Sequence, residues 1–316
     1  MLLGVDVGGT FTDAVLVGDD GTTFTAKASS TPEEQQTGVL AAIELVLARA
    51  GAEAEQVERF AHGMTVATNA LLEGRGARTA LVATDGFTDI VELGRQARAS
   101  LYRLCEANPE PLAPPELRFG APERMGPDGP LRELDLRATD TLLERLEQAK
   151  PEAVAVVLLH SYAHPSHEQE LGELIAKRLP DTHLSLSHEL VGTFREYERA
   201  CTTEVDAALS PLLGAYLRKL GRQANQLGLP AVQVMQSSGG LTDARRAAGH
   251  AALTVLSGPA GGVGGALLLS EAAGERDVLC FDMGGTSCDV CVIDGGRVAE
   301  TAQRTVAGRP LALPAL

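Results

Sequence analysis

The chain of 316 residues has no tryptophan, and aromatic residues make up only 3% of it. It also lacks any run of about 18 uninterrupted apolar residues, the length that a membrane-spanning helix needs. Its first residues lack the basic region of a secretory signal peptide. We therefore expect a cytoplasmic protein that does not bind a membrane, with a core built mainly from leucine, valine and alanine.

Cysteine is scarce, because the chain has only five. So few cysteines do not indicate a disulfide framework. Cys288 and Cys291 form a CxxC pattern that could indicate zinc or redox chemistry, but no second CxxC accompanies it. Residues three apart on a strand face opposite sides, so we expect inert packing for this pair.

Positive charge is also low, with 27 lysines and arginines against 42 acidic residues and a net charge of −15. This balance argues against nucleic acid and anionic membranes as partners. It would also repel a nucleotide at long range. A phosphate site on this chain must therefore depend on local dipoles and a metal ion.

One pattern occurs twice between apolar runs, which predicts a duplicated β-hairpin. The copies read Asp6-Val7-Gly8-Gly9-Thr10-Phe11-Thr12-Asp13 and Asp282-Met283-Gly284-Gly285-Thr286-Ser287-Cys288-Asp289. A single copy could be an ordinary tight turn, since paired glycines between apolar runs are a common turn signal. The recurrence of Asp, Gly, Gly, Thr and Asp at identical spacing favours a shared function, such as holding a polyphosphate between the two hairpins.

The residues of each turn suit phosphate binding. Gly8 and Gly9 permit positive φ and close approach of the backbone to a ligand, and the N–H groups near Gly9 and Thr10 could form an anion-binding concavity. Thr10 and Thr12 add hydroxyl donors. Gly284, Gly285 and Thr286 would do the same in the second copy. The pattern is not a Walker P-loop, because no Gly-Lys-Ser/Thr follows.

The carboxylates of the pattern would repel phosphate unless a cation lay between them. Mg²⁺ fits, because it is a hard ion that takes one or two carboxylates and keeps several waters. Our hypothesis gives Asp6 and Asp282 magnesium-binding or water-positioning roles in catalysis. Asp13 and Asp289 are weaker candidates, and they could instead cap a turn or pair strands.

The periodicity predicts an α/β protein. We expect strands at 2–7, 11–18, 22–28, 57–61, 78–83, 153–159, 183–187 and 231–236, with helices at 32–50, 66–73, 138–149, 166–178 and 195–227 and a small-residue helix from 257. Ser210-Pro211 could break the long helix. Residues 105–130 are rich in proline and glycine, which predicts an irregular excursion or lid. We divide the chain into domains at 1–187 and 188–316.

Several segments, in order along nearly the whole chain, resemble the hydantoinase A/5-oxoprolinase family, which includes N-methylhydantoinase A and acetone carboxylase-like subunits. They are Gly4–Asp13, His62–Glu73, Ala77–Phe87, Glu92–Gln96, Arg195–Arg199, Met235–Leu241, Leu256–Gly262 and Phe281–Ser287. The resemblance implies the ribonuclease H-like fold of the actin-like ATPase superfamily. Family members are usually longer, so we expect a truncation at the C-terminus. Cys288 and Cys291 stand where we expect threonine and serine.

The resemblance implies an ATP-dependent hydrolase subunit that phosphorylates the carbonyl oxygen of a cyclic amide of the hydantoin or 5-oxoproline type. ATP and Mg²⁺ would be its cofactors, and a hydantoinase B-like subunit would complete hydrolysis in a heteromeric complex. Three alternatives stay open: an ATP-dependent ketone carboxylase subunit, a metabolite kinase, and a nucleotide-switched module without catalysis.

Substrate candidates are His62, Thr65 and Asn69, where a strand passes into a helix whose start offers N–H donors. The alternative is a capped helix with His62 in the core. Arg95 could bind a carboxylate or phosphate, or lie on a solvated face. We expect Glu196, Glu198 and Arg199 to form a charged helix face. For His160, His164 and His167 a polar loop is favoured over a metal site.

Overall fold

The computed structural model describes residues 1–31, 34–103, 105–283 and 288–316. Its largest sheet has six strands in the order β12-β11-β4-β1-β2-β3. The strands are β1 (Leu2–Val7), β2 (Phe11–Val17), β3 (Thr23–Ser29), β4 (Arg59–Met64), β11 (Val232–Met235) and β12 (Leu241–Asp243). β1, β2 and β3 form an antiparallel meander, whereas β4 pairs in parallel with both β1 and β11.

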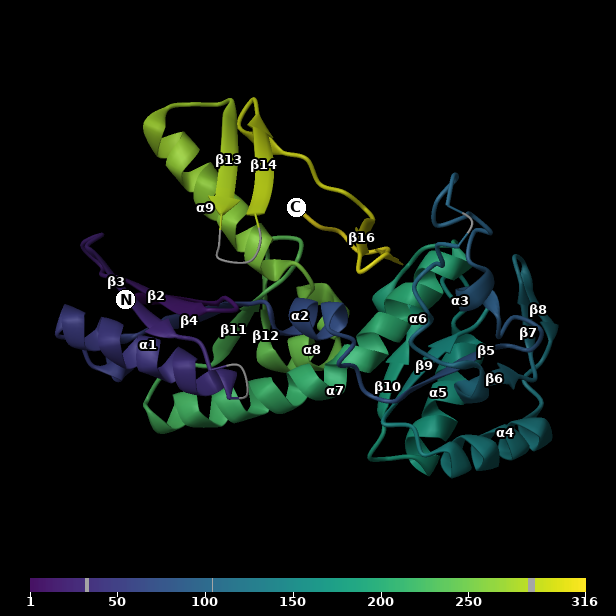
Figure 1. Ribbon diagram of the computed structural model, residues 1–316. Coiled ribbons are helices and arrows are strands. Elements are labelled where there is room, and N and C mark those ends of the chain that lie inside the picture. The colour runs from purple at the N-terminus through teal and green to yellow at the C-terminus, as the bar shows by residue number, and fades with distance from the viewer. Residues whose placement is uncertain (32–33, 104, 284–287) are drawn as a thin grey trace.

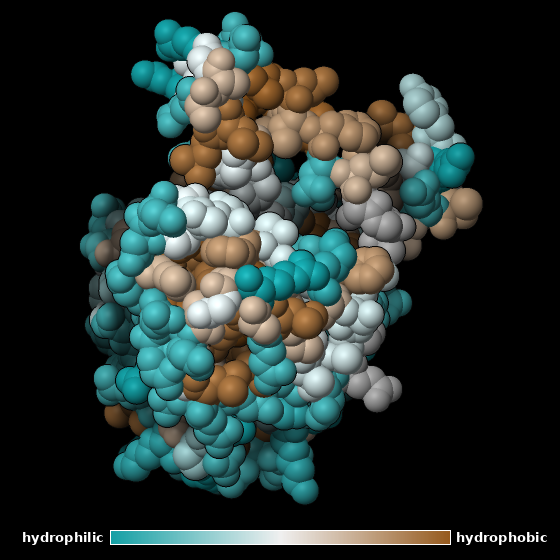
Figure 2. Space-filling model, turned by 90° about the vertical axis from the view of Figure 1, so that its left-hand side faces the viewer, coloured by the Kyte–Doolittle hydropathy of each residue, from teal (hydrophilic) through white to brown (hydrophobic). Residues whose placement is uncertain are grey.

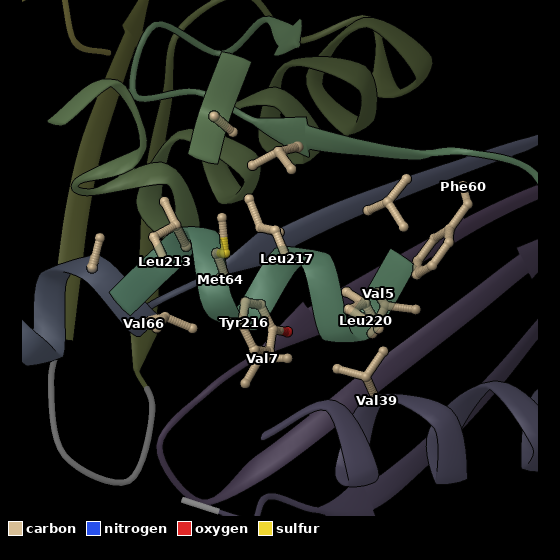
Figure 3. Close-up of a cluster of buried hydrophobic side chains, with 14 of the residues drawn as sticks. Val5, Val7, Val39, Phe60, Met64, Val66, Leu213, Tyr216, Leu217 and Leu220 are labelled. Carbon is tan, nitrogen blue, oxygen red and sulfur yellow. The ribbon is translucent and has the colours of Figure 1, made fainter. Parts of the chain in front are cut away.

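One face of this sheet is covered by α1 (Gln35–Ala50) and by the long helix α7 (Glu196–Gln226). Strand residues alternate between the two faces, so Leu3, Val5 and Val7 are buried under these helices. Figure 3 shows Val5 and Val7 lying among residues of α7 and α1. Asp6 consequently points to the opposite face of the sheet, and Figure 1 shows α9 (Ser257–Ala273) and the last strands on that side.

A second sheet of four parallel strands has the order β10-β9-β5-β6. It consists of β5 (Thr79–Thr84), β6 (Arg118–Ala121), β9 (Ala153–Val157) and β10 (His183–Leu186). α4 (Leu136–Ala149) and α5 (Ser166–Arg178) pack on one face, and α7 with α3 (Ile90–Leu93) covers the other. Strands buried on both faces read as continuous apolar runs, and all five residues of β9 are buried.

Two expectations about this region are wrong. The segment 105–130 is not simply irregular, because it contains β6, β7 (Arg124–Gly126) and the start of β8 (Gly129–Arg132), along with the 3₁₀ turn Pro115–Leu117. α7 also continues through Pro211 without a break. One carbonyl in that turn, that of Ala208, accepts the N–H of Ala77 at 2.8 Å. Contacts along the whole helix therefore hold it together and join the two sheets.

The last third of the chain adds a small-residue helix and a hairpin. α9 (Ser257–Ala273) leads into β13 (Val278–Met283), β14 (Cys288–Asp294) and β15 (Arg297–Val298), and the hairpin of β16 (Arg304–Val306) and β17 (Arg309–Leu311) follows. The remaining elements are α2 (Val66–Leu72), α6 (Ser187–Leu190), α8 (Ala244–Gly249) and the 3₁₀ turns Ala54–Gln56 and Ala251–Thr254. Within the described ranges, no helix is both long and apolar enough to cross a membrane.

The β13–β14 hairpin presents an uncovered apolar face. Leu279, Phe281, Met283, Val290 and Val292 are all more than half exposed. In Figure 2 apolar residues gather on this projecting part of the molecule. Exposed apolar patches of this kind are typical of surfaces that another segment or subunit covers.

Candidate functional site

Asp6 lies on the open face of the large sheet, and a glycine makes room for it. Gly63 of β4 is the residue directly opposite Asp6, and a β-carbon there would lie 2.8 Å from Oδ1 of Asp6. The Asp6 carboxyl keeps a side open to solvent, yet the surrounding protein removes part of its hydration. This loss and the charges of Asp13 and Asp282 raise the pKa of Asp6.

The turn between β1 and β2 does not have the left-handed backbone that its paired glycines would permit. Neither Gly8 nor Gly9 has a positive φ, so left-handed backbone is not why the glycines are here. The N–H of Gly8 donates to the carbonyl of Phe11 at 3.0 Å, and a β-carbon on Gly8 would lie 3.1 Å from that oxygen. The absence of a side chain at Gly8 therefore allows the turn to close this tightly. The N–H groups of Gly9 and Thr10 have no backbone partner among the described residues, and they are the donors that a ligand could use.

Thr12 does not supply a hydroxyl to the ligand side. Its side chain is fully buried and its Oγ1 lies 3.1 Å from Oγ of Ser30, which in turn donates to the carbonyl of Gly8 at 2.8 Å. Thr12 thus helps to hold the turn in place through Ser30 and does not face a ligand. Asp13 lies opposite Asp6 on β2, and it forms an ion pair with Lys27 at 2.9 Å.

The second hairpin repeats the pairing of the first. Asp282 lies opposite Asp289, as Asp6 lies opposite Asp13. The turn residues Gly284, Gly285 and Thr286 lie outside the described residues. Cys291 faces Cys280 across the strands, whereas Cys288 is exposed, and all five cysteines are free.

α9 contacts both the large sheet, at β4, and the second hairpin. Ser257 in the first turn of α9 donates to the carbonyl of Met64 at 2.9 Å, and the N–H of Leu256 donates to Thr68 at 3.0 Å. Further along α9, a β-carbon on Gly262 would lie 3.4 Å from Oδ2 of Asp282. The first turns of a helix carry unpaired N–H groups that attract anions. A cavity of about 310 Å³ beside them is lined by Asp282, Asp289 and Gly262, among others.

Thr65 and Asn69 hold the framework of this site. The hydroxyl of Thr65 donates to the carbonyl of Val7 at 3.0 Å, and the Asn69 amide donates to Thr65 at 3.2 Å. Both side chains therefore tie α2 to the end of β1. Any contact with a substrate would be additional to these bonds.

His62 belongs to the core, so its candidate role in binding substrate does not fit the structure. Its side chain is fully buried, with Nε2 2.7 Å from the hydroxyl of Tyr216 and Nδ1 3.2 Å from the carbonyl of Val5. Burial lowers the pKa of His62 to about 4, so the ring is neutral. Two bonds to protein leave neither ring nitrogen for a ligand.

Arg95 is 45% exposed, but its guanidinium is already paired with acidic side chains of α7 and is not free to bind an anion. It forms two hydrogen bonds to the carboxylate of Glu198, at 3.1 and 2.5 Å, and lies 3.6 Å from Glu196. Arg199 is fully buried and donates to the carbonyls of Leu158 and Thr193. The expected charged helix face is thus wrong for Glu198 and Arg199, because α7 packs between two sheets.

Other polar residues also lie in buried networks that sequence reasoning missed. Glu123 is fully buried and lies 2.9 Å from Nδ1 of His167, whose Nε2 is 3.1 Å from Glu133. His164 binds the carbonyl of Pro127 at 2.9 Å. No group of three potential metal ligands occurs in the part of the chain that the structure describes.

Comparison with known proteins gives the family. The model for the hydantoinase/oxoprolinase N-terminal region matches residues 2–179, and the hydantoinase/oxoprolinase model matches residues 199–316. The chain belongs to the hydantoinase/oxoprolinase family. The six-stranded sheet and duplicated hairpins agree with the fold that the family resemblance predicts, because solved structures of the family superpose on the whole chain.

The relatives differ in what their names say they do. The caprolactamase subunit alpha of Pseudomonas jessenii is 34% identical over 93% of this chain and 44% of its own length. The 5-oxoprolinase 1 of Arabidopsis thaliana is 36% identical over 83% of this chain and 22% of its own length. A nucleotide-free acetone carboxylase structure has a TM-score of 0.89 at 28% identity, covering 100% of this chain and 47% of that one. The chain thus spans less than half the length of these relatives.

Proposed function

We propose that this chain binds Mg·ATP between its two Asp–Gly–Gly–Thr hairpins and phosphorylates the carbonyl oxygen of a cyclic amide, as one subunit of an ATP-dependent hydrolase. The observation that carries the proposal is the convergence of Asp6 and Asp282. They come from separate hairpins, yet the charge of Asp282 is close enough to raise the pKa of Asp6. The names of the caprolactamase and 5-oxoprolinase relatives support the substrate class.

Two carboxylates of this site, those of Asp6 and Asp282, would suit a magnesium ion that keeps most of its waters. The charges of Asp13 and Asp282 both act on Asp6, and of these three aspartates only Asp13 has an ion-pair partner, Lys27, among the described residues. A divalent cation would relieve the repulsion that raises the pKa of Asp6, and Mg²⁺ prefers carboxylate oxygens. Asp6 and Asp282 would hold it. When bound, the ion would supply charge neutralisation for the phosphate oxygens.

The chain's own groups would position the phosphates. The N–H groups of Gly9 and Thr10, which have no backbone partner among the described residues, would bind phosphate oxygens, and we propose the same role for Gly284, Gly285 and Thr286 in the second hairpin. The start of α9 adds a positive dipole end. Asp13 and Asp289 would lie opposite Asp6 and Asp282 on the neighbouring strand of each hairpin.

The reaction follows from the weak electrophilicity of an amide. The carbonyl oxygen of the substrate attacks the γ-phosphorus of ATP, and ADP leaves with the electrons of the broken bond. Water would then add to the activated carbonyl carbon, the ring C–N bond would break with the nitrogen leaving as the amine, and hydrolysis of the resulting acyl phosphate would release phosphate and the carboxylate. Phosphoryl transfer depends mainly on positioning and charge neutralisation, which two facing hairpins provide. Several relatives are named as subunits, so we propose a hydantoinase B-like partner for the hydrolytic step.

A second candidate is an ATP-dependent ketone carboxylase subunit. The likeness to acetone carboxylase over the whole chain favours it, as does the similarity to the acetophenone carboxylase gamma subunit of Aromatoleum aromaticum. The hairpins would then activate a ketone enolate and bicarbonate instead of an amide. The same nucleotide site serves both candidates, so substrate tests must separate them.

Calorimetric titration with ATP, with and without Mg²⁺, tests the nucleotide site. We expect magnesium-dependent binding that Asp6→Asn and Asp282→Asn abolish and that Asp181→Asn, an exposed control far from the hairpins, leaves intact. Unchanged binding in both site variants, or no binding by the chain, would contradict the proposal. ADP release stimulated by hydantoin, 5-oxoproline or caprolactam in the presence of a partner subunit would support the hydrolase, and stimulation by acetone with bicarbonate the carboxylase.

A further inference from the structure

The structure pairs Cys291 with a cysteine other than the one that the CxxC pattern suggests. Cys291 on β14 lies directly opposite Cys280 on β13, whereas Cys288 lies opposite Met283. Figure 1 shows β13 and β14 side by side. Directly opposite residues of an antiparallel pair have their side chains on the same face of the sheet. Residues three apart on one strand face opposite sides, so Cys291 shares its face with Cys280 and not with Cys288.

The spacing of Cys280 and Cys291 suits a disulfide bond. Directly opposite residues of an antiparallel pair have Cα atoms about 4.5 or 5.5 Å apart, and a disulfide requires a Cα separation of roughly 4.4–6.8 Å. Both thiols are free. They also act on each other, because burial and the neighbouring Cys280 thiol raise the pKa of Cys291. The backbone therefore already holds the two sulfur atoms where a bond between them could form.

A small reagent can reach this pair of cysteines. Both are partly exposed, and both line the cavity of about 310 Å³ beside α9. Cys201, by contrast, is buried. Cysteines that respond to oxidants are accessible to solvent and often lie next to a second cysteine that completes the reaction. Cys280 and Cys291 combine these two properties.

The pair also lies next to the carboxylates of the second hairpin. Cys280 is two residues before Asp282, and Cys291 is two residues after Asp289. Because side chains two apart on a strand lie on the same face, all four side chains share one face of the hairpin. All four residues also line the same cavity. A change at the cysteines would therefore act directly on the position of the two carboxylates.

The first hairpin has no such pair. Its equivalent positions, two residues before Asp6 and two residues after Asp13, hold Gly4 and Val15. These two residues lie opposite each other, as Cys280 and Cys291 do, but they cannot form a cross-link. A bond between the cysteines would therefore change the second hairpin and leave the first as it is.

We propose that Cys280 and Cys291 are a modification site, at which a low-molecular-weight disulfide converts the two thiols into a cross-strand disulfide. The thiolate of one cysteine attacks a sulfur of the reagent, forms a mixed disulfide and displaces the first reagent thiolate. The thiolate of the other cysteine then attacks the protein sulfur of that mixed disulfide and displaces the second reagent thiolate. The two cysteines together lose two electrons and two protons, and the reagent is reduced to two thiols.

The disulfide would weaken nucleotide binding between the hairpins, a consequence that rests on the proposed function. The Cβ atoms of opposite residues lie about 4.5–5.5 Å apart, whereas those of a disulfide lie about 3.8 Å apart. Closing the bond therefore draws the two strands together by roughly 1 Å, two residues from Asp282 and Asp289. Because a displacement of this size is costly for positioned groups, we expect the affinity for Mg·ATP to fall about tenfold.

Peptide mapping by mass spectrometry, after treatment with oxidised glutathione, tests the disulfide. Cleavage before each aspartate places Cys280, Cys288 and Cys291 on separate peptides, 277–281, 282–288 and 289–293. We expect the first and third peptides to be joined, and dithiothreitol to separate them. In Cys280→Ser the glutathione should stay on Cys291, because no second thiol can displace it. Cys288→Ser is the matched control and should form the joined peptides like the wild type.

Three mapping results would overturn the inference: a disulfide between Cys288 and Cys291, a stable mixed disulfide with glutathione at Cys280 or Cys291 of the wild type, or no reaction at these two cysteines. Circular dichroism melting curves identify any variant that has unfolded. The mapping requires no nucleotide, so its outcome does not depend on the proposed function.

Calorimetric titration with Mg·ATP, before and after oxidation, tests the effect on the hairpins. The oxidised wild type should bind about tenfold more weakly than the reduced wild type, and dithiothreitol should restore its affinity. The double variant Cys280→Ser/Cys291→Ser should bind equally well before and after treatment. Equal affinity of the oxidised and reduced wild type would refute the effect on the hairpins. A mapped disulfide in a chain that binds no Mg·ATP in either form would refute the nucleotide site and leave the modification site in place.

Discussion

The position of His62 can be tested by its effect on stability. The sequence allowed two interpretations, a substrate contact or a core residue, and the structure places the ring between Tyr216 and the Val5 carbonyl. We expect His62→Gln to remove a pH dependence from the free energy of unfolding. Glutamine does not titrate, and its amide can replace part of the hydrogen bonding.

The magnitude follows from the pKa. The pKa of His62 is about 4 in the folded chain, against 6.5 for an ordinary histidine. The unfolded state therefore binds a proton first, and the stability due to the neutral ring is full above pH 6.5 and is lost as the pH falls toward 4. At about 1.36 kcal/mol per pKa unit, the loss between pH 7.5 and pH 5.5 is about 1.3 kcal/mol.

The assay is urea unfolding of the wild type and the variant at these two pH values. The chain has no tryptophan, so far-ultraviolet circular dichroism is the better probe, and linear extrapolation gives each free energy. The pH stays above the pI of about 4.9, where loss of net charge favours precipitation. The pH-dependent change should be about 1.3 kcal/mol smaller in His62→Gln than in the wild type.

Tyr216→Phe is the control, because it keeps the buried imidazole and removes its partner. It should cost about 1–3 kcal/mol at pH 7.5 through the unpaired ring nitrogen, while the pH dependence persists. If wild type and His62→Gln instead change equally with pH, the imidazole is not buried and neutral. His62 would then return to the list of substrate candidates.

Further expectations concern the hairpin site and the helix α7. Gly63→Ala should weaken Mg·ATP binding by calorimetry, since its β-carbon would lie 2.8 Å from Oδ1 of Asp6 and must displace that carboxylate, whereas Gly4→Ala, which has open space, should bind normally. The raised pKa of Asp6 means that its carboxylate becomes protonated at a higher pH than an ordinary aspartate does. As the pH is lowered, the affinity for magnesium should therefore begin to fall at a higher pH than it would with an ordinary aspartate. Glu198→Ala should destabilise the chain in urea unfolding by only about 0.5–1 kcal/mol, because the Arg95 guanidinium that loses its main partner is 45% exposed and can be hydrated; a loss of several kcal/mol would refute this.

The sequence alone determined the local elements well. The strands 2–7 and 11–18 and the helix 166–178 occur at or within one residue of the predicted bounds. These elements have strong apolar periodicity, and their ends carry clear turn signals. The paired hairpins were also predictable, because the repeated pattern is local and identical in spacing. Residues 105–130 were not predicted correctly, since short strands between prolines carry too little periodicity.

Only the tertiary structure decided which of the candidate polar residues lie on the open face of the large sheet and which lie in the core. Asp6 and Asp282 lie 276 positions apart (282 minus 6), and the sequence could suggest but not establish that they converge. His62 and Arg199 looked equally accessible in the sequence, yet both are fully buried. The reason is physical: local patterns set the direction of a side chain relative to its own strand or helix. What covers that face depends on contacts between segments far apart in the chain, such as α7 packing against two sheets.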